Sequence, residues 1–137
     1  MAMKVEISIT LRQRILDHAR SSQTEVCGLL LGNRERIIAV ERCANVSSEP
    51  ATRFELDPAA LIAAWRAARS GGPQVIGHYH SHPTGNPRPS PTDAAEAAPD
   101  GAIWIIVGAG EMAAWRAVEC GALHGRFDPV ELIVTAE

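Results

Sequence analysis

The sequence predicts a mixed α/β domain, with helices packed on one β-sheet. Two observations indicate this class. Short apolar or alternating runs that suit strands occur in both halves of the chain, and two stretches between them place apolar residues at helical spacing. The 137 residues suit one domain, 1–137, with no internal repeat.

Composition excludes several classes of protein. The net charge is −3 and there is no run of Lys or Arg, which argues against nucleic acid or an acidic membrane as the main partner. Three cysteines without a C-x-x-C pair imply neither a disulfide framework nor a cysteine-only zinc site. No segment reads as a signal peptide or bilayer span, so we expect a cytoplasmic protein. The oligomeric state stays open.

The first elements alternate between strand and helix. Residues 4–9 alternate polar and apolar and predict a strand, and Thr10 then caps a helix over 11–20. The apolar run 25–32 is bounded by glycine and predicts a buried strand, and 36–46 predicts its neighbour across a short turn.

A second helix has clear signals at both ends. Asp57 is expected to be the N-cap and Pro58 the first helical residue, and Gly71–Pro73 ends the helix. The residues at helical spacing predict its apolar face, which we expect to be Leu61, Ile62, Trp65 and Ala68.

The second half of the chain is mostly strand. Residues 74–81 predict a strand, and 102–107 are apolar on both faces, which is typical of a central strand. The sequence GAGE at 108–111 predicts a hairpin turn into 112–120. Residues 123–134 fit either a last strand or a short helix.

The chemistry concentrates in GHYHSHPTGNPRPSPTD, residues 77–93. Alternate side chains on a strand share a face, so the Cα atoms of His80 and His82 should lie about 6.6 Å apart. Two imidazoles at that spacing can bind one metal ion at about 2.0–2.1 Å. His78 points the same way but lies about 13 Å from His82, so we exclude it as a ligand.

Asp93 is the nearest candidate for a third ligand. Ser90-x-x-Asp93 predicts a helix start that places this carboxylate in the first turn, and the prolines of loop 83–91 stiffen the approach. Two His and one Asp leave one position of a tetrahedral zinc open, which is typical of a catalytic site. Zinc-bound water has a pKa of about 7.

Each of these residues also has an ordinary explanation. A lone histidine near a strand end usually makes plain hydrogen bonds, and Ser90-x-x-Asp93 alone could be only a capping box. His18 and His124 belong to no cluster in the sequence and are expected at the surface or core edge. Cys27 is expected to be a small buried hydrophobe.

The pattern H-x-H, seven residues, then S-x-x-D resembles the JAMM motif of the MPN-domain (MPN+, Mov34/MPN/PAD-1-like) zinc metalloproteases. The segment EVCGLLLG, which contains Glu25, is similar to another part of that family. The resemblance implies a compact prokaryotic member with a cytidine-deaminase-like α/β/α sandwich, a mixed sheet flanked by helices. It implies that one Zn²⁺ per chain is held by His80, His82 and Asp93, that Glu25 is the general base, and that Ser90 donates to the oxyanion.

The resemblance further implies a zinc isopeptidase that cleaves the amide after the C-terminal Gly-Gly of a ubiquitin-like or sulfur-carrier protein. One alternative is a zinc peptidase acting on peptidoglycan or other peptides. Another is a non-catalytic, zinc-stabilised binding or scaffold module, although a structural site would need neither Glu25 nor Ser90. The absence of P-C-x-x-C makes a zinc deaminase a poor alternative.

Overall fold

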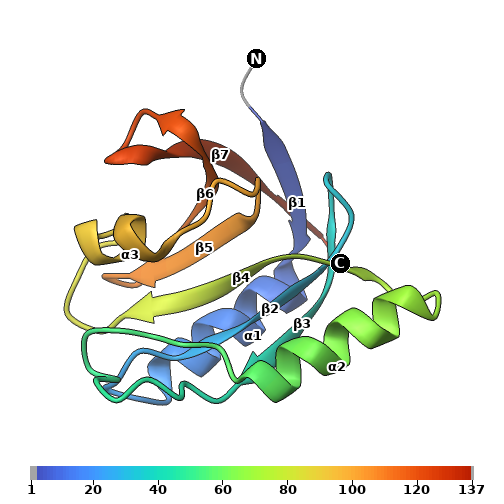
Figure 1. Ribbon diagram of the computed structural model, residues 1–137, viewed down its shortest axis with the longest axis horizontal. Helices are drawn as coiled ribbons and strands as arrows, with labels where there is room; N and C mark the ends of the chain where they lie inside the picture. The colour runs from blue at the N-terminus through green and yellow to red at the C-terminus, as the bar shows by residue number, and fades with distance from the viewer. Residues whose placement is uncertain (1–2, 137) are drawn as a thin grey trace.

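The computed structural model describes residues 3–136, which form one mixed sheet with helices on both faces (Figure 1). In chain order the elements are β1 (Lys4–Ser8), α1 (Ile9–Arg20), β2 (Cys27–Gly32), β3 (Ile37–Cys43), α2 (Pro58–Arg69), β4 (Gln74–His82), α3 (Pro91–Glu96), β5 (Ile103–Gly108), β6 (Glu111–Gly121) and β7 (Gly125–Thr135). The predicted fold class is confirmed. No helix in this described part is long and apolar enough to cross a membrane.

The sheet has seven strands in the order β1-β7-β6-β5-β4-β2-β3. Two neighbouring pairs are parallel, β1 with β7 and β4 with β5, and the other pairs are antiparallel. β5 lies at the centre with all six residues buried, as its apolar sequence predicts. β4 lies beside it, so the histidine strand has a neighbour on each side and is held firmly in place.

Two apolar clusters occupy the two faces of the sheet. α1 buries Leu11, Ile15 and Leu16 against one face, where the larger cluster includes Tyr79 and Ile105. The smaller cluster lies on the other face, around Trp104, Ala117 and Phe127, and the partly buried Ala94 and Ala97 of the α3 region pack against it. Helices therefore flank the sheet on both sides, and α3 is anchored on the face that carries His80 and Trp104.

The predicted start of α1 was wrong by two residues. Ser8, not Thr10, is the N-cap: its backbone is extended, and its hydroxyl accepts the Leu11 N–H at 3.1 Å. β1 consequently ends at Ser8. Both Ser8 and Thr10 are good capping residues, and the strand pairing of β1 with β7 through Ser8 decides between them.

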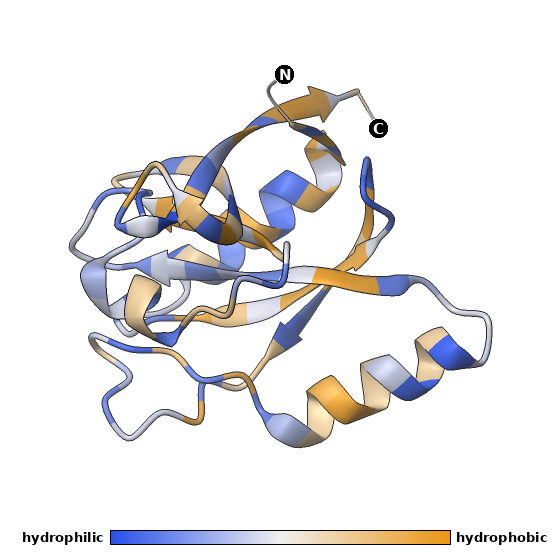
Figure 2. Cartoon of the chain, turned by 45° about the horizontal axis from the view of Figure 1, so that its top comes forward, coloured by the Kyte–Doolittle hydropathy of each residue, from blue (hydrophilic) through white to orange (hydrophobic). Residues whose placement is uncertain are grey.

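The ends of α2 are confirmed, but its predicted apolar face is confirmed only in part, since Leu61 and Ala68 are half-buried and Ile62 and Trp65 are exposed. Asp57 accepts the Ala59 N–H at 3.1 Å, and Pro58 is the first helical residue. The buried residue of α2 is Ala64, whereas Ile62 and Trp65 are 46% and 48% exposed. Figure 2 shows apolar and hydrophilic segments mixed along α2.

The C-terminal region is a strand, which resolves the alternative left by the sequence. β7 pairs with β6 on one side and with β1 on the other. The hairpin turn between β5 and β6 is confirmed, with Ala109 and Gly110 both at positive φ.

Candidate functional site

The two histidines at the end of β4 and the aspartate of α3 converge. The Nε2 atoms of His80 and His82 lie 3.1 Å apart, and Asp93 Oδ2 lies 3.3 Å from the first and 3.1 Å from the second. β4 supplies both rings from one face of the strand, and the start of α3 supplies the carboxylate.

The spacing of these three atoms fits a tetrahedral metal ion. Ligand atoms at 2.0–2.1 Å around a tetrahedral centre are separated by about 3.3 Å, close to the spacings observed here. The set is two imidazole nitrogens and one carboxylate oxygen, the donor types that zinc binds in proteins. These residues can therefore hold a metal ion.

Local contacts orient both imidazoles. His82 donates its Nδ1–H to the Asn86 carbonyl at 2.8 Å, which leaves the Nε2 lone pair free to bind a metal. His80 is fully buried, and its ring stacks on Phe54 with centroids 4.1 Å apart. Burial lowers the pKa of His80, so its ring stays neutral, the form that binds metals.

A capping box fixes Asp93. The Ser90 N–H donates to Asp93 Oδ2 at 2.9 Å, and the Asp93 N–H donates to Ser90 Oγ at 3.0 Å. Burial opposes ionisation of Asp93, but hydrogen bonds from His80 and His82 hold its pKa below the usual range. Because Ser90 Oγ only accepts in the box, its own hydrogen remains available for donation.

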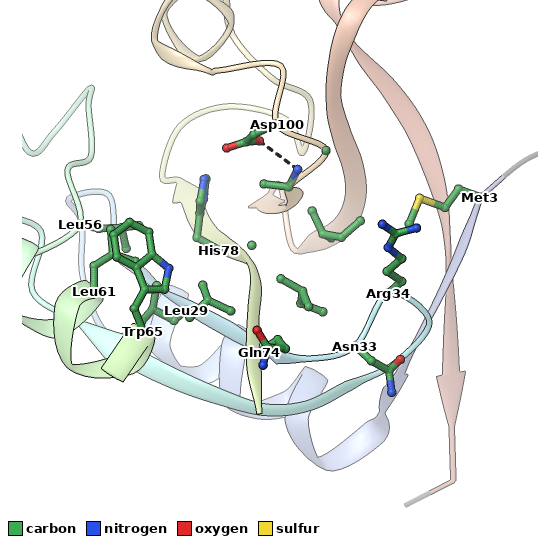
Figure 3. A pocket seen from close by; sticks show the side chains of 16 residues that line it. Met3, Leu29, Asn33, Arg34, Leu56, Leu61, Trp65, Gln74, His78 and Asp100 are labelled. Carbon is green, nitrogen blue, oxygen red and sulfur yellow. Dashed lines mark hydrogen bonds between the residues drawn. The ribbon is translucent and has the colours of Figure 1, made fainter. Parts of the chain in front are cut away.

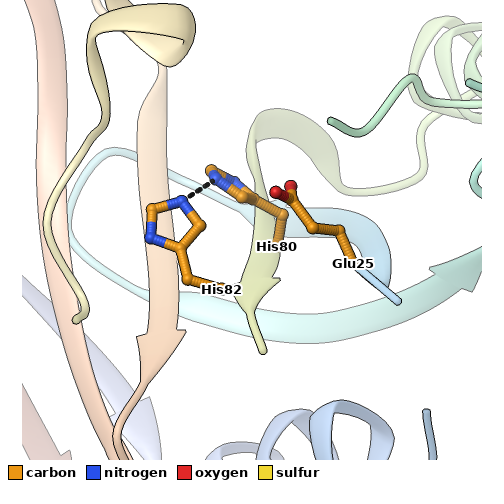
Figure 4. A group of neighbouring side chains, drawn as sticks. All are labelled: Glu25, His80 and His82. Atoms are coloured by element: carbon orange, nitrogen blue, oxygen red, sulfur yellow. Dashed lines mark hydrogen bonds between the residues drawn. The ribbon is translucent and has the colours of Figure 1, made fainter. Parts of the chain in front are cut away.

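Glu25, two residues before the start of β2, brings a second carboxylate to the histidines. Its oxygen and a ring nitrogen of each of His80 and His82 lie within 4.8 Å of one another, and its side chain points toward them (Figure 4). Glu25 is 6% exposed, and its Oε1 is buried without a hydrogen-bond partner in the part of the chain that the structure describes. Burial raises its pKa to about 7. An unpartnered buried carboxylate with that pKa can exchange a proton near neutral pH.

The loop between β3 and α2 fixes the backbone of Glu25. The Glu25 N–H donates to the Pro50 carbonyl at 2.7 Å, and Asn45 Nδ2 donates to the Glu25 carbonyl at 2.8 Å. Asn45 and Phe54 were not predicted as part of the site. No local pattern in the sequence marks either residue, since each is identified by a contact with a distant segment.

The remaining histidines lie outside this cluster. His78 Nδ1 is buried without a partner, its ring centroid is 6.5 Å from that of His80, and burial lowers its pKa to about 3. It lines a separate cavity of about 560 Å³ together with Leu61 and Trp65 of α2 (Figure 3). His18 hydrogen-bonds the Tyr79 hydroxyl at 2.7 Å.

Comparisons with known proteins identify a family and several relatives for this chain. A family described as prokaryotic homologs of the JAB domain matches residues 8–118. A desampylase of Haloferax volcanii is 34% identical over 110 residues, covering 75% of this chain and 79% of the relative. A Thermus thermophilus protein named as a probable TtuB-protein conjugate cleaving protease is 40% identical over 80 residues, covering 57% of this chain and 52% of that protein.

A solved structure shows the same architecture. The solution structure of a protein from Desulfitobacterium hafniense superposes with a TM-score of 0.83 at 25% sequence identity, covering 97% of this chain and 94% of that one. The match extends over nearly the whole chain, so it includes the strands and helix that carry the candidate site.

Proposed function

Because this chain belongs to the family of prokaryotic homologs of the JAB domain, we propose that it is a zinc-dependent isopeptidase. Its substrate would be a ubiquitin-like or sulfur-carrier protein, cleaved at the amide that follows the C-terminal Gly-Gly. The names of the Haloferax and Thermus relatives support a reaction on protein conjugates. The free thiols of Cys27, Cys43 and Cys120 suit a reducing cytoplasm as the location.

The observation that carries the proposal is the convergence of three metal-ligand atoms beside an unpartnered carboxylate. His80, His82 and Asp93 would hold one Zn²⁺ per chain, because their three atoms have tetrahedral spacing. Bound zinc would supply a water of low pKa and polarise the substrate carbonyl. We assign the third ligand to Asp93 rather than Glu25 because the capping box already points Oδ2 at both rings.

Glu25 would act as the proton carrier. Its Oε1 has no hydrogen-bond partner among residues 3–136, so it can accept a proton from the attacking water. Because burial raises its pKa to about 7, it can release that proton to the departing amine nitrogen. A carboxylate with an ordinary pKa would bind the proton less tightly at neutral pH between its removal from water and its transfer to the amine.

Ser90 would stabilise negative charge on the substrate. Its Oγ accepts from the Asp93 N–H, which fixes the oxygen beside the ligand cluster and leaves the hydroxyl hydrogen for the scissile carbonyl oxygen.

Intact mass spectrometry tests the proposal. The zinc-loaded protein is incubated with a sulfur-carrier protein extended beyond its Gly-Gly, with Glu25→Gln as the control variant. Loss of the extension in the wild type alone supports the reaction. One bound zinc per chain without cleavage of this substrate or of ubiquitin-like conjugates would identify a binding module and overturn the proposal.

A further inference from the structure

Loop 83–91 cannot hold its own shape by backbone hydrogen bonds. Four of its nine residues are proline, which has no N–H, so few donors remain within the loop. Two of the remaining N–H groups bond locally: Gly85 donates to the His82 carbonyl, and Arg88 donates to the Asn86 side chain. The carbonyl groups further along the loop need donors from elsewhere.

Those donors are the ring N–H groups of three side chains. His82 Nδ1 donates to the Asn86 carbonyl at 2.8 Å, and Trp115 Nε1 donates to the Pro87 carbonyl at 3.0 Å. His124 Nε2 donates to the Pro89 carbonyl at 3.1 Å. His82 is a proposed metal ligand, whereas Trp115 and His124 come from β6 and the β6–β7 turn.

We propose that Trp115 and His124 are positioning residues for the site. This inference rests on the proposed function. The two residues hold loop 83–91, which carries the Asn86 carbonyl that accepts from His82 and, near its other end, Ser90. Fixing Pro87 keeps the adjacent Asn86 carbonyl where it orients the His82 ring. Fixing Pro89 keeps the adjacent Ser90, and through its capping box Asp93, in place.

Trp115 is well placed for this role because its ring is anchored. It packs against the apolar cluster that contains Trp104 and Phe127, and Ala94 of α3 packs against the same cluster. β6 is thus held to the helix that carries Asp93 and, through the indole N–H, to the loop that precedes it. A small shift of the loop would therefore disturb both the His82 ring and the Asp93 carboxylate.

The turn that carries His124 has an unusual residue choice. His124 and Gly125 have φ values of 53° and 67°, and the Arg126 N–H donates to the Leu123 carbonyl at 3.0 Å. Two-residue hairpin turns with positive φ at both positions favour Asn-Gly. His is a poorer residue for this position, so its ring N–H contact gives a reason for its presence.

Because His is a poor turn residue, substitutions at position 124 can separate the effect on stability from the effect on the position of the loop. His124→Asn should form a better turn, but its side chain is too short to reach the Pro89 carbonyl. His124→Gln is worse for the turn, but its amide can donate from about the position of Nε2. Trp115→Phe keeps an aromatic ring in the cluster and removes only the N–H donor.

The experiment measures four quantities for each variant: kcat and KM on the extended sulfur carrier, zinc affinity by competition with a chelator, and stability to urea. Cys120→Asn is the matched control, since it introduces the same residue at an exposed positive-φ position of β6, in the hairpin that carries His124. We expect His124→Asn and Trp115→Phe to lose about tenfold in kcat or zinc affinity, with KM nearly unchanged. His124→Asn should be at least as stable as the wild type.

Several results would overturn the assignment. Zinc affinity and kcat within twofold of the wild type in both variants would do so. Equal losses in His124→Asn and His124→Gln would show that the Nε2–H contact is not responsible, and a comparable loss in Cys120→Asn would indicate a general effect of substitutions in this hairpin. If the wild type cleaves nothing, the isopeptidase proposal fails, but zinc affinity and ¹⁵N relaxation at Gly85, Asn86 and Arg88 in the metal-free protein still decide the positioning role.

Discussion

Val26 and Ser81 form a reciprocal pair of hydrogen bonds. The Val26 N–H donates to Ser81 Oγ at 3.0 Å, and the Ser81 N–H donates to the Val26 carbonyl at 3.1 Å. Val26 directly follows Glu25, and Ser81 lies between His80 and His82 of β4. The pair therefore ties the proposed general base to the proposed metal ligands, which are 55 or more positions away in the chain.

Removing the Ser81 hydroxyl should weaken both the fold and the site. Ser81 is 3% exposed, so Ser81→Ala leaves a buried Val26 N–H without a partner, a cost of about 1–3 kcal/mol. Urea unfolding measures this loss, and kcat should fall because Glu25 is held less firmly. Thr84→Ala, which removes an exposed hydroxyl from the next loop, is the control and should change stability little. Equal stability of the two variants would contradict the prediction.

Glu25→Gln should retain zinc and lose turnover. The amide is nearly the same size as the carboxylate but cannot accept and release a proton, so kcat should fall roughly 10²–10⁴-fold. Zinc content by native mass spectrometry should stay at one ion per chain. If the variant lost zinc as well, Glu25 would be a ligand, and the assignment of the third ligand to Asp93 would need revision.

His80→Leu and His78→Leu should differ in metal binding, although both histidines lie on the same face of β4. The first substitution removes a ring whose Nε2 lies within 3.3 Å of both other ligand atoms, so zinc binding should be lost. The second removes a buried nitrogen without a partner, so zinc affinity should be kept and stability should be equal or higher. Loss of zinc from the His78 variant would show that the exclusion of His78 is wrong.

Ser90→Ala should cost stability and activity separately. Loss of the N-cap should destabilise the protein by about 1 kcal/mol, and loss of the hydroxyl donor should lower kcat by roughly 10²-fold. Ser8→Ala is a matched control because Ser8 caps α1 in the same way, accepting the Leu11 N–H at 3.1 Å. It should lose similar stability and keep its kcat. A parallel loss of kcat in both variants would remove the oxyanion role of Ser90.

The stability of the metal-free protein should depend on pH through Glu25. Its pKa is raised from 4.5 to about 7 in the folded state, so the folded protein binds the proton more tightly than the unfolded chain. This contribution is fully present below the unfolded pKa and is lost as pH rises through about 7. Urea unfolding from about pH 5 to about pH 8 should therefore show wild type losing stability relative to Glu25→Gln, by on the order of 3 kcal/mol. Parallel curves would show that the Glu25 pKa is not raised.

The sequence by itself determined the features that depend on neighbours in the chain. The H-x-H spacing places two rings on one face of a strand, and Ser90 with Asp93 makes a capping box within one helical turn. The Asp57 cap and the buried central strand at 103–108 also follow from local patterns, because helix and strand periodicity act over a few residues. Glu25 was identified only through the resemblance to the metalloprotease family.

Only the tertiary structure decided the features that depend on distant segments. Pairing of β2 with β4 places Cys27 opposite His80 and so brings Glu25 to the histidines. Pairing of β1 with β7 selects Ser8 over Thr10, and the way α2 lies on the sheet buries Ala64 and leaves Trp65 half exposed. The contacts of Trp115 and His124 with loop 83–91 also depend on distant segments. Such contacts join residues with no fixed spacing, so the packing of the sheet, and no local pattern, specifies them.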